Sequence, residues 1–209
     1  MTNLAVSKSP LTPSDIVACL RTGGVVLLPT DTVFGLAVMP TKAEGVDRLY
    51  ALKARPRAKA LPIMLANATQ VAELGVLMGP AIEQALNCPF VPGALTIAAP
   101  IDPRNCPYWL QGREEVAFRI PNSALLLDVL TQIGPLLVTS ANLAGAPTPS
   151  TAPGVLEQLT GRPDLVVEGK TGADVASTLV NCSYSPAVIE RIGAVSVAEL
   201  SQWLAVQHD

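Results

Sequence analysis

Histidine is almost absent from this chain. Among 209 residues there is one histidine, His208, and it is the penultimate residue. A histidine general base, a Ser-His-Asp triad and a histidine-based zinc site all need an imidazole held inside a folded site. We therefore expect none of these three kinds of site, and the chemistry of the chain must rest on other side chains.

Cysteine is scarce as well, and the spacing of the cysteines does not suit a metal site. The four cysteines are far apart and form no CxxC pair, which is the wrong spacing for a zinc site or an iron-sulfur cluster. We expect four buried, unreactive thiols in a reducing cytosol. They are Cys19, Cys88, Cys106 and Cys182. The sequence thus predicts no protein metal site.

Charged and aromatic residues are also few. Charged residues make up 15% of the chain, where about a quarter is usual. The 14 basic residues are outnumbered by 17 acidic ones, and the isoelectric point is near 5.2. This balance gives no overall attraction to nucleic acid, and an aromatic content of 4% leaves few rings for base stacking. A site for a polyanion would therefore be local, so each basic cluster is informative.

Long apolar runs are missing. No window approaches the roughly 18 apolar residues that a membrane helix needs, and the first ten residues hold no run typical of a signal peptide. The chain is nevertheless 49% hydrophobic with a mean hydropathy of +0.40, which is enough for a core of its own. We expect a cytoplasmic protein without a membrane partner, with residues 1–209 forming a single domain.

Short apolar runs alternate with segments of helical pattern. Thr12 followed by Pro13 predicts a helix start, and Thr41 with Glu44 predicts a capping box at the start of another helix that ends before Pro56. Other helices are expected at 69–78, 80–87, 123–133, 155–160 and 197–206, and strands at 25–28, 61–65, 95–98, 116–120, 136–139, 165–167, 178–180 and 193–195. This pattern predicts a mixed α/β (α+β) fold with about seven strands flanked by helices.

Four of the fourteen basic residues stand within seven positions. They are Lys53, Arg55, Arg57 and Lys59. Pro56 ends the preceding helix, so Lys53 belongs to its last turn and the others to the exit loop. Converging cations can bind a phosphate, but solvated charges at the negative end of a helix dipole would give the same pattern. The strand that follows holds the loop at a sheet edge, which favours the phosphate interpretation.

Hydroxyl and amide side chains follow two of the predicted strands. Thr32 comes after the strand at 25–28, and Ser140 and Asn142 come after the strand at 136–139. Ligands of open α/β sheets bind where strands end, although such residues are equally typical of ordinary capped turns. Arg119, just before Pro121, offers a planar fork that suits a carboxylate.

Taken in order, these blocks resemble the YrdC family of threonylcarbamoyl-adenylate synthases. The matching motifs are PTDTVFGL at 29–36, KxRP at 53–56 with a further lysine at 59, PGxLT at 92–96, RIP at 119–121, SAN at 140–142, STLV at 177–180 and RIGAVS at 191–196. The resemblance runs from about Gly23 to Ser196. It implies a YrdC-like twisted mixed sheet around a concave, positively lined cavity, in the short form without a further C-terminal domain.

The resemblance also implies an activity. Family members are nucleotidyltransferases that make threonylcarbamoyl-AMP and pyrophosphate from L-threonine, bicarbonate and ATP with Mg²⁺, for the tRNA threonylcarbamoyl-transfer proteins that act next. By position, the family's catalytic tetrad falls on Lys53, Arg55, Ser140 and Asn142. The nucleotide-binding positions fall on Arg55, Lys59, Asn142, Ser150 and Arg191. The threonine-binding positions fall on Thr32, Arg119, Ser140 and Ser177. Met64 stands where longer relatives place a threonine-contacting histidine.

Two alternatives of other kinds stay open. One is an RNA-binding module that binds RNA in the same basic concavity, and weak RNA binding by the enzyme also stays open. The acidic isoelectric point and the few aromatic residues argue against an RNA-binding module. The other is a relative that carbamoylates a different acceptor. Such domains usually belong to larger chains with zinc-finger-like cysteines, and this sequence has none.

Overall fold

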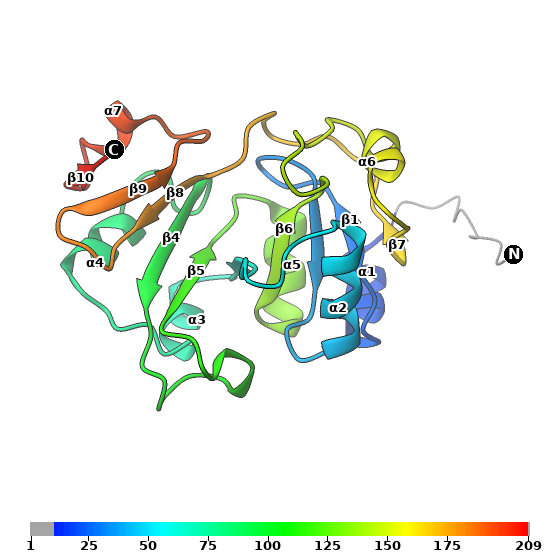
Figure 1. The fold of residues 1–209 in the computed structure, drawn as a ribbon, viewed down its shortest axis with the longest axis horizontal. Helices are drawn as coiled ribbons and strands as arrows, with labels where there is room; N and C mark the ends of the chain where they lie inside the picture. Colours follow the sequence, from blue (N-terminus) through cyan, green and yellow to red (C-terminus); the bar gives the residue numbers. More distant parts are fainter. Residues whose placement is uncertain (1–10, 209) are drawn as a thin grey trace, which may run out of the picture.

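The structure of this chain is a computed structural model that describes residues 11–208. Residues 1–10 and 209 lie outside this range, and with them the N-terminal stretch for which the sequence predicts no signal peptide. Figure 1 shows the described part as a broad sheet accompanied by short helices.

Ten strands of the described residues form one mixed sheet, in the order β10-β9-β8-β4-β5-β3-β6-β2-β1-β7. The strands are β1 Val26–Leu28, β2 Gly35–Val38, β3 Ile63–Met64, β4 Leu95–Pro100, β5 Glu115–Arg119, β6 Leu136–Ser140, β7 Leu165–Val166, β8 Thr178–Asn181, β9 Ala187–Arg191 and β10 Val206–Gln207. Four pairings are parallel (β1 with β7, β3 with β5, β4 with β8, β9 with β10), and the other five are antiparallel. The mixed α/β class predicted from the sequence is confirmed.

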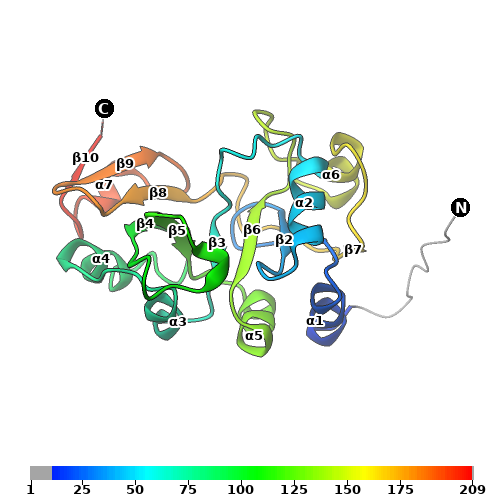
Figure 2. The ribbon, with the colours of Figure 1, turned by 60° about the horizontal axis from the view of Figure 1, so that its bottom comes forward.

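Helices cover both faces of this sheet. They are α1 Pro13–Arg21, α2 Ala43–Leu52, α3 Ala68–Glu73, α4 Pro80–Leu86, α5 Ala124–Ile133, α6 Ala152–Gln158 and α7 Val197–Leu200, with a 3₁₀ turn at Tyr108–Leu110. In Figure 2, α1, α5, α3 and α4 lie along one face, and α2 and α6 lie on the other. Because both faces are covered, β1 and β2 are buried at every residue, as their unbroken apolar sequences require.

The helix α1 shows how local sequence sets this packing. Thr12 caps its start by accepting from the Asp15 backbone N–H, while the Asp15 carboxylate accepts from the Thr12 backbone N–H. Apolar residues at helical spacing, Ile16 and Leu20, then face the core and are fully buried, in one cluster with Leu126 and Leu130 of α5. The two helices therefore cover the sheet together.

Several expected elements differ in the structure. Residues 193–195 are not a strand, because the Gly193 and Val195 amides donate to the Thr178 hydroxyl instead of to a neighbouring strand. The strand β9, which comes just before this segment in the chain, is not among the predicted strands. It ends in the polar pair Glu190 and Arg191, which hides the apolar pattern. The strand β2 is not among the predicted strands either, because it is short and directly follows the polar segment after β1.

Two helix ends also differ. The predicted capping box at Thr41 is wrong, because α2 begins at Ala43 after Lys42 and has no side-chain cap. The predicted helix at 197–206 ends at Leu200, and residues 206–207 pair with β9 as the parallel edge strand β10.

Two expectations on composition can be compared with residues 11–208. In that range no helix is long and apolar enough to cross a membrane. All four cysteines are free; Cys88 and Cys182 are buried, as expected, while Cys19 and Cys106 are partly exposed. Burial raises the pKa of the Cys182 thiol to about 12, so that thiol stays protonated and unreactive.

Candidate functional site

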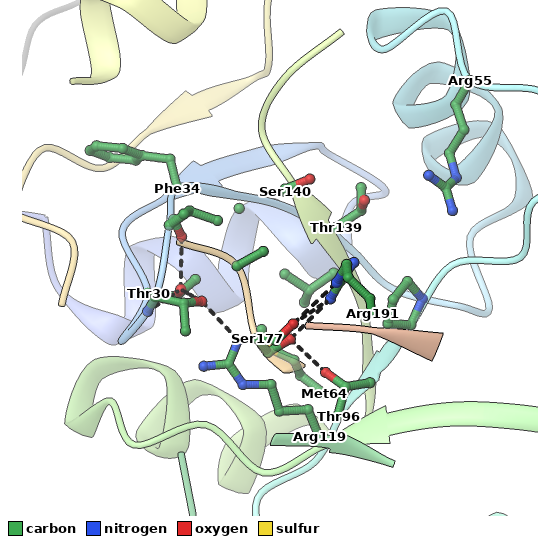
Figure 3. Close-up of a pocket in the computed structure, with 16 residues that line it drawn as sticks. Thr30, Phe34, Arg55, Met64, Thr96, Arg119, Thr139, Ser140, Ser177 and Arg191 are labelled. Atoms are coloured by element: carbon green, nitrogen blue, oxygen red, sulfur yellow. Dashed lines mark hydrogen bonds between the residues drawn. The ribbon is translucent and has the colours of Figure 1, made fainter. Parts of the chain in front are cut away.

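A cavity lies over the middle of the sheet, where β3 is only two residues long. It holds about 650 Å³ of space, including the part open to solvent, and its wall comes from both halves of the sheet. Six of the residues assigned from the sequence line it together: Thr32, Arg55, Arg119, Ser140, Ser177 and Arg191. Figure 3 shows Arg191 beside Ser177, with Arg119 close below them and Arg55 set apart from this group.

Arg119 forms one corner of the cavity. Its side chain is only 5% exposed, and its Nε donates to the Gly93 carbonyl (2.7 Å) while Nη1 donates to the Thr32 hydroxyl (2.8 Å). Nη2 forms an ion pair with Asp31 Oδ2 at 2.8 Å but has no hydrogen-bond partner of suitable geometry among the described residues. Burial lowers the pKa of Arg119, and Asp31 opposes that effect. The guanidinium is thus fixed with donors left over for a ligand.

The turn after β1 holds Thr32 in this corner. The Thr30 hydroxyl donates to the Val33 carbonyl (2.7 Å) and accepts from the Thr32 backbone N–H (3.0 Å). The Thr30 and Thr32 hydroxyl oxygens are themselves 3.1 Å apart, and both side chains are buried. The hydroxyls after β1 therefore form a rigid hydrogen-bonded wall.

Ser177 and Arg191 form another part of the cavity wall. Arg191 donates through Nε (3.1 Å) and Nη2 (2.8 Å) to the Ser177 carbonyl, and Nη2 also reaches the Ser177 hydroxyl at 3.2 Å. That hydroxyl lies 2.7 Å from the Thr96 hydroxyl, as the dashed lines in Figure 3 show. Burial lowers the pKa of Arg191, and the charge of Arg55 lowers it further, so both arginines contribute to one positive field.

A glycine makes the approach to Ser177 possible. A Cβ on Gly193 would lie 2.2 Å from the Ala176 carbonyl oxygen and 2.5 Å from the Ser177 carbonyl carbon. Only a residue without a side chain can bring the backbone after Arg191 this close, so the RIGAVS block sets the position of Arg191 through Gly193.

Lys53 and Asn142 lie behind the wall of the cavity. Lys53 is 1% exposed, and its Nζ donates to the backbone carbonyls of Ser140 and Asn142. The Asn142 amide donates to the carbonyls of Leu143 and Ala146, at 2.7 Å each. Neither side chain lines the cavity, whereas Ser140 does. The structure therefore brings only two of the predicted tetrad, Arg55 and Ser140, to the cavity surface.

The basic cluster after α2 does not converge as a unit. Arg55 lines the cavity and closes its own loop by donating to the carbonyls of Lys59 (3.0 Å) and Ala60 (2.9 Å). The Lys59 side chain is exposed outside the cavity wall, as is Ser150. Arg57 pairs with Asp47 at 2.6 Å and lies over the Tyr50 ring. Of the four basic residues, Arg55 alone is among the lining residues.

The wall also contains hydroxyls that the sequence analysis did not assign. Thr30, Thr96 and Thr139 line the cavity and are buried. Thr96 stands within the otherwise apolar strand β4, and Thr139 follows three apolar residues of β6. A buried hydroxyl needs a partner, so a threonine inside an apolar, buried strand is a sequence signal that could have identified this wall. Met64 also lines it, beside its strand neighbour Arg119.

The cavity wall offers nothing to hold a resident Mg²⁺ ion. None of its lining residues is a carboxylate, and residues 11–208 contain no group of three or more His, Cys, Asp or Glu side chains that could hold a metal. The Asp31 carboxylate is not a lining residue; it pairs with Arg119 and accepts from the Asn122 backbone N–H (3.0 Å). The residues thus do not fit a protein-bound magnesium ion, and an ion carried by nucleotide phosphates would be part of the substrate.

The arrangement favours an anionic ligand with polar groups at two ends. Three arginines (Arg55, Arg119 and Arg191) line the space together with hydroxyls from four strands or turns. Arg119 is paired with Asp31, which is not a lining residue, and no carboxylate is among the lining residues. Such a site can bind two anionic groups at once, one in the Arg119 corner and one between Arg55 and Arg191.

Comparison with known proteins agrees with this geometry. The profile of the Sua5/YciO/YrdC family, described as telomere recombination, matches residues 18–193. A threonylcarbamoyl-AMP synthase of Bacillus subtilis is 35% identical over 196 residues, covering 91% of this chain and 56% of that protein. One of Photobacterium profundum is 30% identical over 183 residues, covering 84% of this chain and 96% of that protein.

A solved structure gives the same result. The crystal structure of Pyrococcus abyssi Sua5 complexed with L-threonine matches with a TM-score of 0.81 and 27% identity, over 95% of this chain and 61% of that one. The chain thus spans little more than half of the Bacillus and Pyrococcus proteins and nearly all of the Photobacterium protein. On the profile match and the shared fold, the chain belongs to the Sua5/YciO/YrdC family.

Proposed function

We propose that this chain is an L-threonylcarbamoyladenylate synthase, which forms threonylcarbamoyl-AMP and pyrophosphate from L-threonine, bicarbonate and ATP. The observation that carries the proposal is the convergence, in one cavity, of the fixed Arg119 corner and the Arg55–Arg191 pair. The names of the related synthases and the L-threonine in the P. abyssi Sua5 structure support the choice of substrates.

L-Threonine is proposed to bind at the Arg119 corner. Its carboxylate fits the unpaired Nη2 hydrogens of Arg119, which Thr32 and Gly93 already hold in place. The hydroxyls of Ser140 and Ser177 face the same space and can accept or donate to the amino and hydroxyl groups of the substrate. The amine then points toward the arginine pair, where the reaction takes place.

ATP is proposed to bind between Arg55 and Arg191. Two arginines without a lining carboxylate supply the charge that a triphosphate needs. Lys59 and Ser150 are exposed on the loops outside this wall, where a triphosphate that extends out of the cavity would meet them. We assign Asn142 to the same half through the loop that it organises.

The chemistry needs positioning and charge neutralisation rather than a protein nucleophile. The amine of threonine and bicarbonate give a carbamate with loss of water. A carbamate oxygen then forms a bond to the α-phosphorus of ATP as the bond to pyrophosphate breaks. Arg55 and Arg191 stabilise the negative charge that shifts to the leaving group, and Mg²⁺ enters with ATP as part of that substrate. This scheme explains why the site holds no histidine.

Pyrophosphate release tests this proposal. The purified protein should release pyrophosphate only when L-threonine, bicarbonate and MgATP are all present, and leaving out any one should reduce the signal to background. ATP cleavage that does not depend on threonine or bicarbonate would contradict it. Binding of RNA with no pyrophosphate release would favour the RNA-binding alternative. We also propose a cytoplasmic location and transfer of the product to the tRNA threonylcarbamoyl-transfer proteins.

A further inference from the structure

Lys53 is a buried cation that the proposed reaction does not use. It is the C-terminal cap residue of α2, and its side chain is among the largest fully buried ones of the described chain. Its Nζ donates to the carbonyls of Ser140 and Asn142, the latter at 2.6 Å, and lies 3.5 Å from Asn142 Oδ1. All three acceptors belong to the turn at 140–142, directly after β6.

These contacts use the whole donor capacity of the ammonium group. A lysine side chain carries three N–H donors and no acceptor, and the three oxygens of the turn match that number. A buried ammonium group that lost these acceptors would carry an unpaired charge. Lys53 therefore has no donor left for a phosphate unless it gives up a contact with the turn.

The turn that Lys53 holds organises the loop beyond it. Asn142 Oδ1 accepts from the Thr148 hydroxyl (3.2 Å), and Asn142 Nδ2 donates to the Leu143 and Ala146 carbonyls. The backbone adds a second tie to α2, since the Ala144 amide donates to the Lys53 carbonyl at 3.0 Å. The loop at 142–148 is thus built on Lys53 through both its side chain and its backbone.

The same tie links the two halves of the cavity. Ser140, whose side chain lines the wall, is the last residue of β6, and Arg55, which lines the wall from the other side, is two residues after Lys53. Figure 3 shows Arg55 apart from the hydrogen-bonded group around Ser177, so contacts among the lining residues do not fix its place relative to Ser140.

We propose that Lys53 is a positioning residue that locks the turn at 140–142 against the end of α2 and so sets the spacing between Arg55 and Ser140, without contact to the nucleotide. The substrates named on either side rest on the proposed function, whereas the lock itself rests on the contacts alone. The absence of any carboxylate among its hydrogen-bond partners agrees with a cation held by carbonyl dipoles.

Hydrogen exchange on three variants tests the lock. Lys53→Met keeps the length and removes the donors, Lys53→Arg keeps the charge but replaces three tetrahedral donors by a planar fork, and the control Lys42→Met removes an exposed lysine at the other end of α2. In the ligand-free protein, both Lys53 variants should exchange the amides of 141–146 at least about tenfold faster than the control. Unchanged exchange in Lys53→Met would overturn the proposal.

Ligand measurements on the same variants separate positioning from direct contact. In turnover with ATP, Lys53→Met should lower kcat more than about 100-fold, and Lys53→Arg should not rescue kcat. In binding experiments with a non-hydrolysable ATP analogue, the Kd of Lys53→Met should change less than about threefold. A loss of analogue affinity in Lys53→Met that Lys53→Arg restores would show a charge acting on phosphate and overturn the lock. Because exchange is measured without substrate, a chain that releases no pyrophosphate refutes the proposed function and leaves this test valid.

An NMR measurement on the wild-type protein tests the proposal even if the Lys53 variants do not fold. The ammonium hydrogens of Lys53 should give a resolved, slowly exchanging NMR signal, and saturating ATP analogue should move it less than the guanidinium signals of Arg55 and Arg191. A Lys53 signal that moves more than both arginine signals would overturn the proposal.

Discussion

The guanidinium of Arg119 and the carboxylate of Asp31 form an ion pair at 2.8 Å with only 5% and 12% of the two side chains exposed. Asp31 Oδ1 has no hydrogen-bond partner in the described chain, and Arg119 Nη2 keeps unpaired hydrogens. The hydrogen bonds to Gly93 and Thr32 hold Arg119 in place, while the pair with Asp31 leaves donor and acceptor capacity unused. This combination suits a residue that must stay fixed and still bind a carboxylate.

Removing the Arg119 charge should act mainly on threonine. We expect Arg119→Ala to weaken L-threonine binding by about 100-fold, because a buried, hydrogen-bonded charge partner is lost, while affinity for an ATP analogue changes less than about threefold. Isothermal titration with each ligand checks this. Equal losses for both ligands would contradict the division of the cavity into two halves.

Removing the Asp31 charge should act on stability. Asp31→Asn leaves the Arg119 guanidinium buried without its counter-ion, and breaking such a pair from one side costs about 3 to 5 kcal/mol of the free energy of unfolding. Urea denaturation measures this cost. The control is Asp47→Asn, which removes the carboxylate of the exposed pair with Arg57 and should cost about 1 kcal/mol or less. Equal costs in the two variants would contradict the assignment.

Arg55 and Arg191 should both act on the nucleotide. Each of Arg55→Ala and Arg191→Ala should weaken binding of an ATP analogue by about tenfold to 100-fold, the range of a charge-assisted hydrogen bond. Arg191→Ala should also affect L-threonine, because Arg191 donates to the Ser177 hydroxyl. A loss of threonine affinity in Arg55→Ala larger than in Arg191→Ala would contradict this geometry.

The backbone approach at Gly193 gives a steric prediction. Gly193→Ala would place a Cβ 2.2 Å from a backbone oxygen, so we expect a loss of about 1 to 3 kcal/mol in the free energy of unfolding and displacement of Arg191. Gly79→Ala is the matched control, because nothing lies within 4 Å of a Cβ there. Similar unfolding midpoints for the two variants would show that the Ala176–Gly193 contact is not close.

The pH dependence follows from Lys53. Burial, with a smaller effect of Arg55, lowers the pKa of Lys53 from 10.5 to about 8. Between these values the unfolded chain keeps a proton that the folded protein has lost, so this group makes the free energy of unfolding rise with pH across that window. Activity should move the opposite way and fall above about pH 8, because a neutral amine has only two N–H donors for the turn.

Paired pH profiles of kcat and of urea unfolding for the wild type and Lys53→Met check this expectation. The variant should lack the inflection near pH 8 in both profiles. An inflection retained in the variant would assign it to another group.

The apolar runs explain where Arg119 and Ser140 lie, because each of these residues ends a strand that the pattern contains. Arg191 ends β9, which the pattern does not contain, so its place was expected only from the family resemblance. The directions of Lys53 and Arg57 could not be predicted. Lys53 donates to backbone carbonyls far along the chain, and Arg57 lies over the Tyr50 ring on the surface of α2. The residues next to Lys53 and Arg57 in the sequence do not indicate either contact.

Most of the apolar strands follow from the sequence pattern, whereas the apolar strand β2 and the partly polar strands β9 and β10 do not. β1 is an unbroken apolar run and β6 is apolar up to Val138, and the sequence predicts both. β9 is polar at one end because that end reaches the cavity, and β10 is two residues held only by its pairing with β9. Tertiary pairing, rather than local propensity, forms these two strands.

The most direct measurement is the fate of the carbon of bicarbonate. The purified protein, given ¹⁴C-bicarbonate, L-threonine and MgATP, should produce a radioactive compound that co-elutes with AMP absorbance and has the mass of threonylcarbamoyl-AMP. Omitting threonine should abolish the labelled product. The Arg119→Ala variant should form this product only at a much higher threonine concentration than the wild type needs. Release of pyrophosphate with no label in an adenylate would contradict the central claim that this cavity joins bicarbonate, threonine and the α-phosphate of ATP.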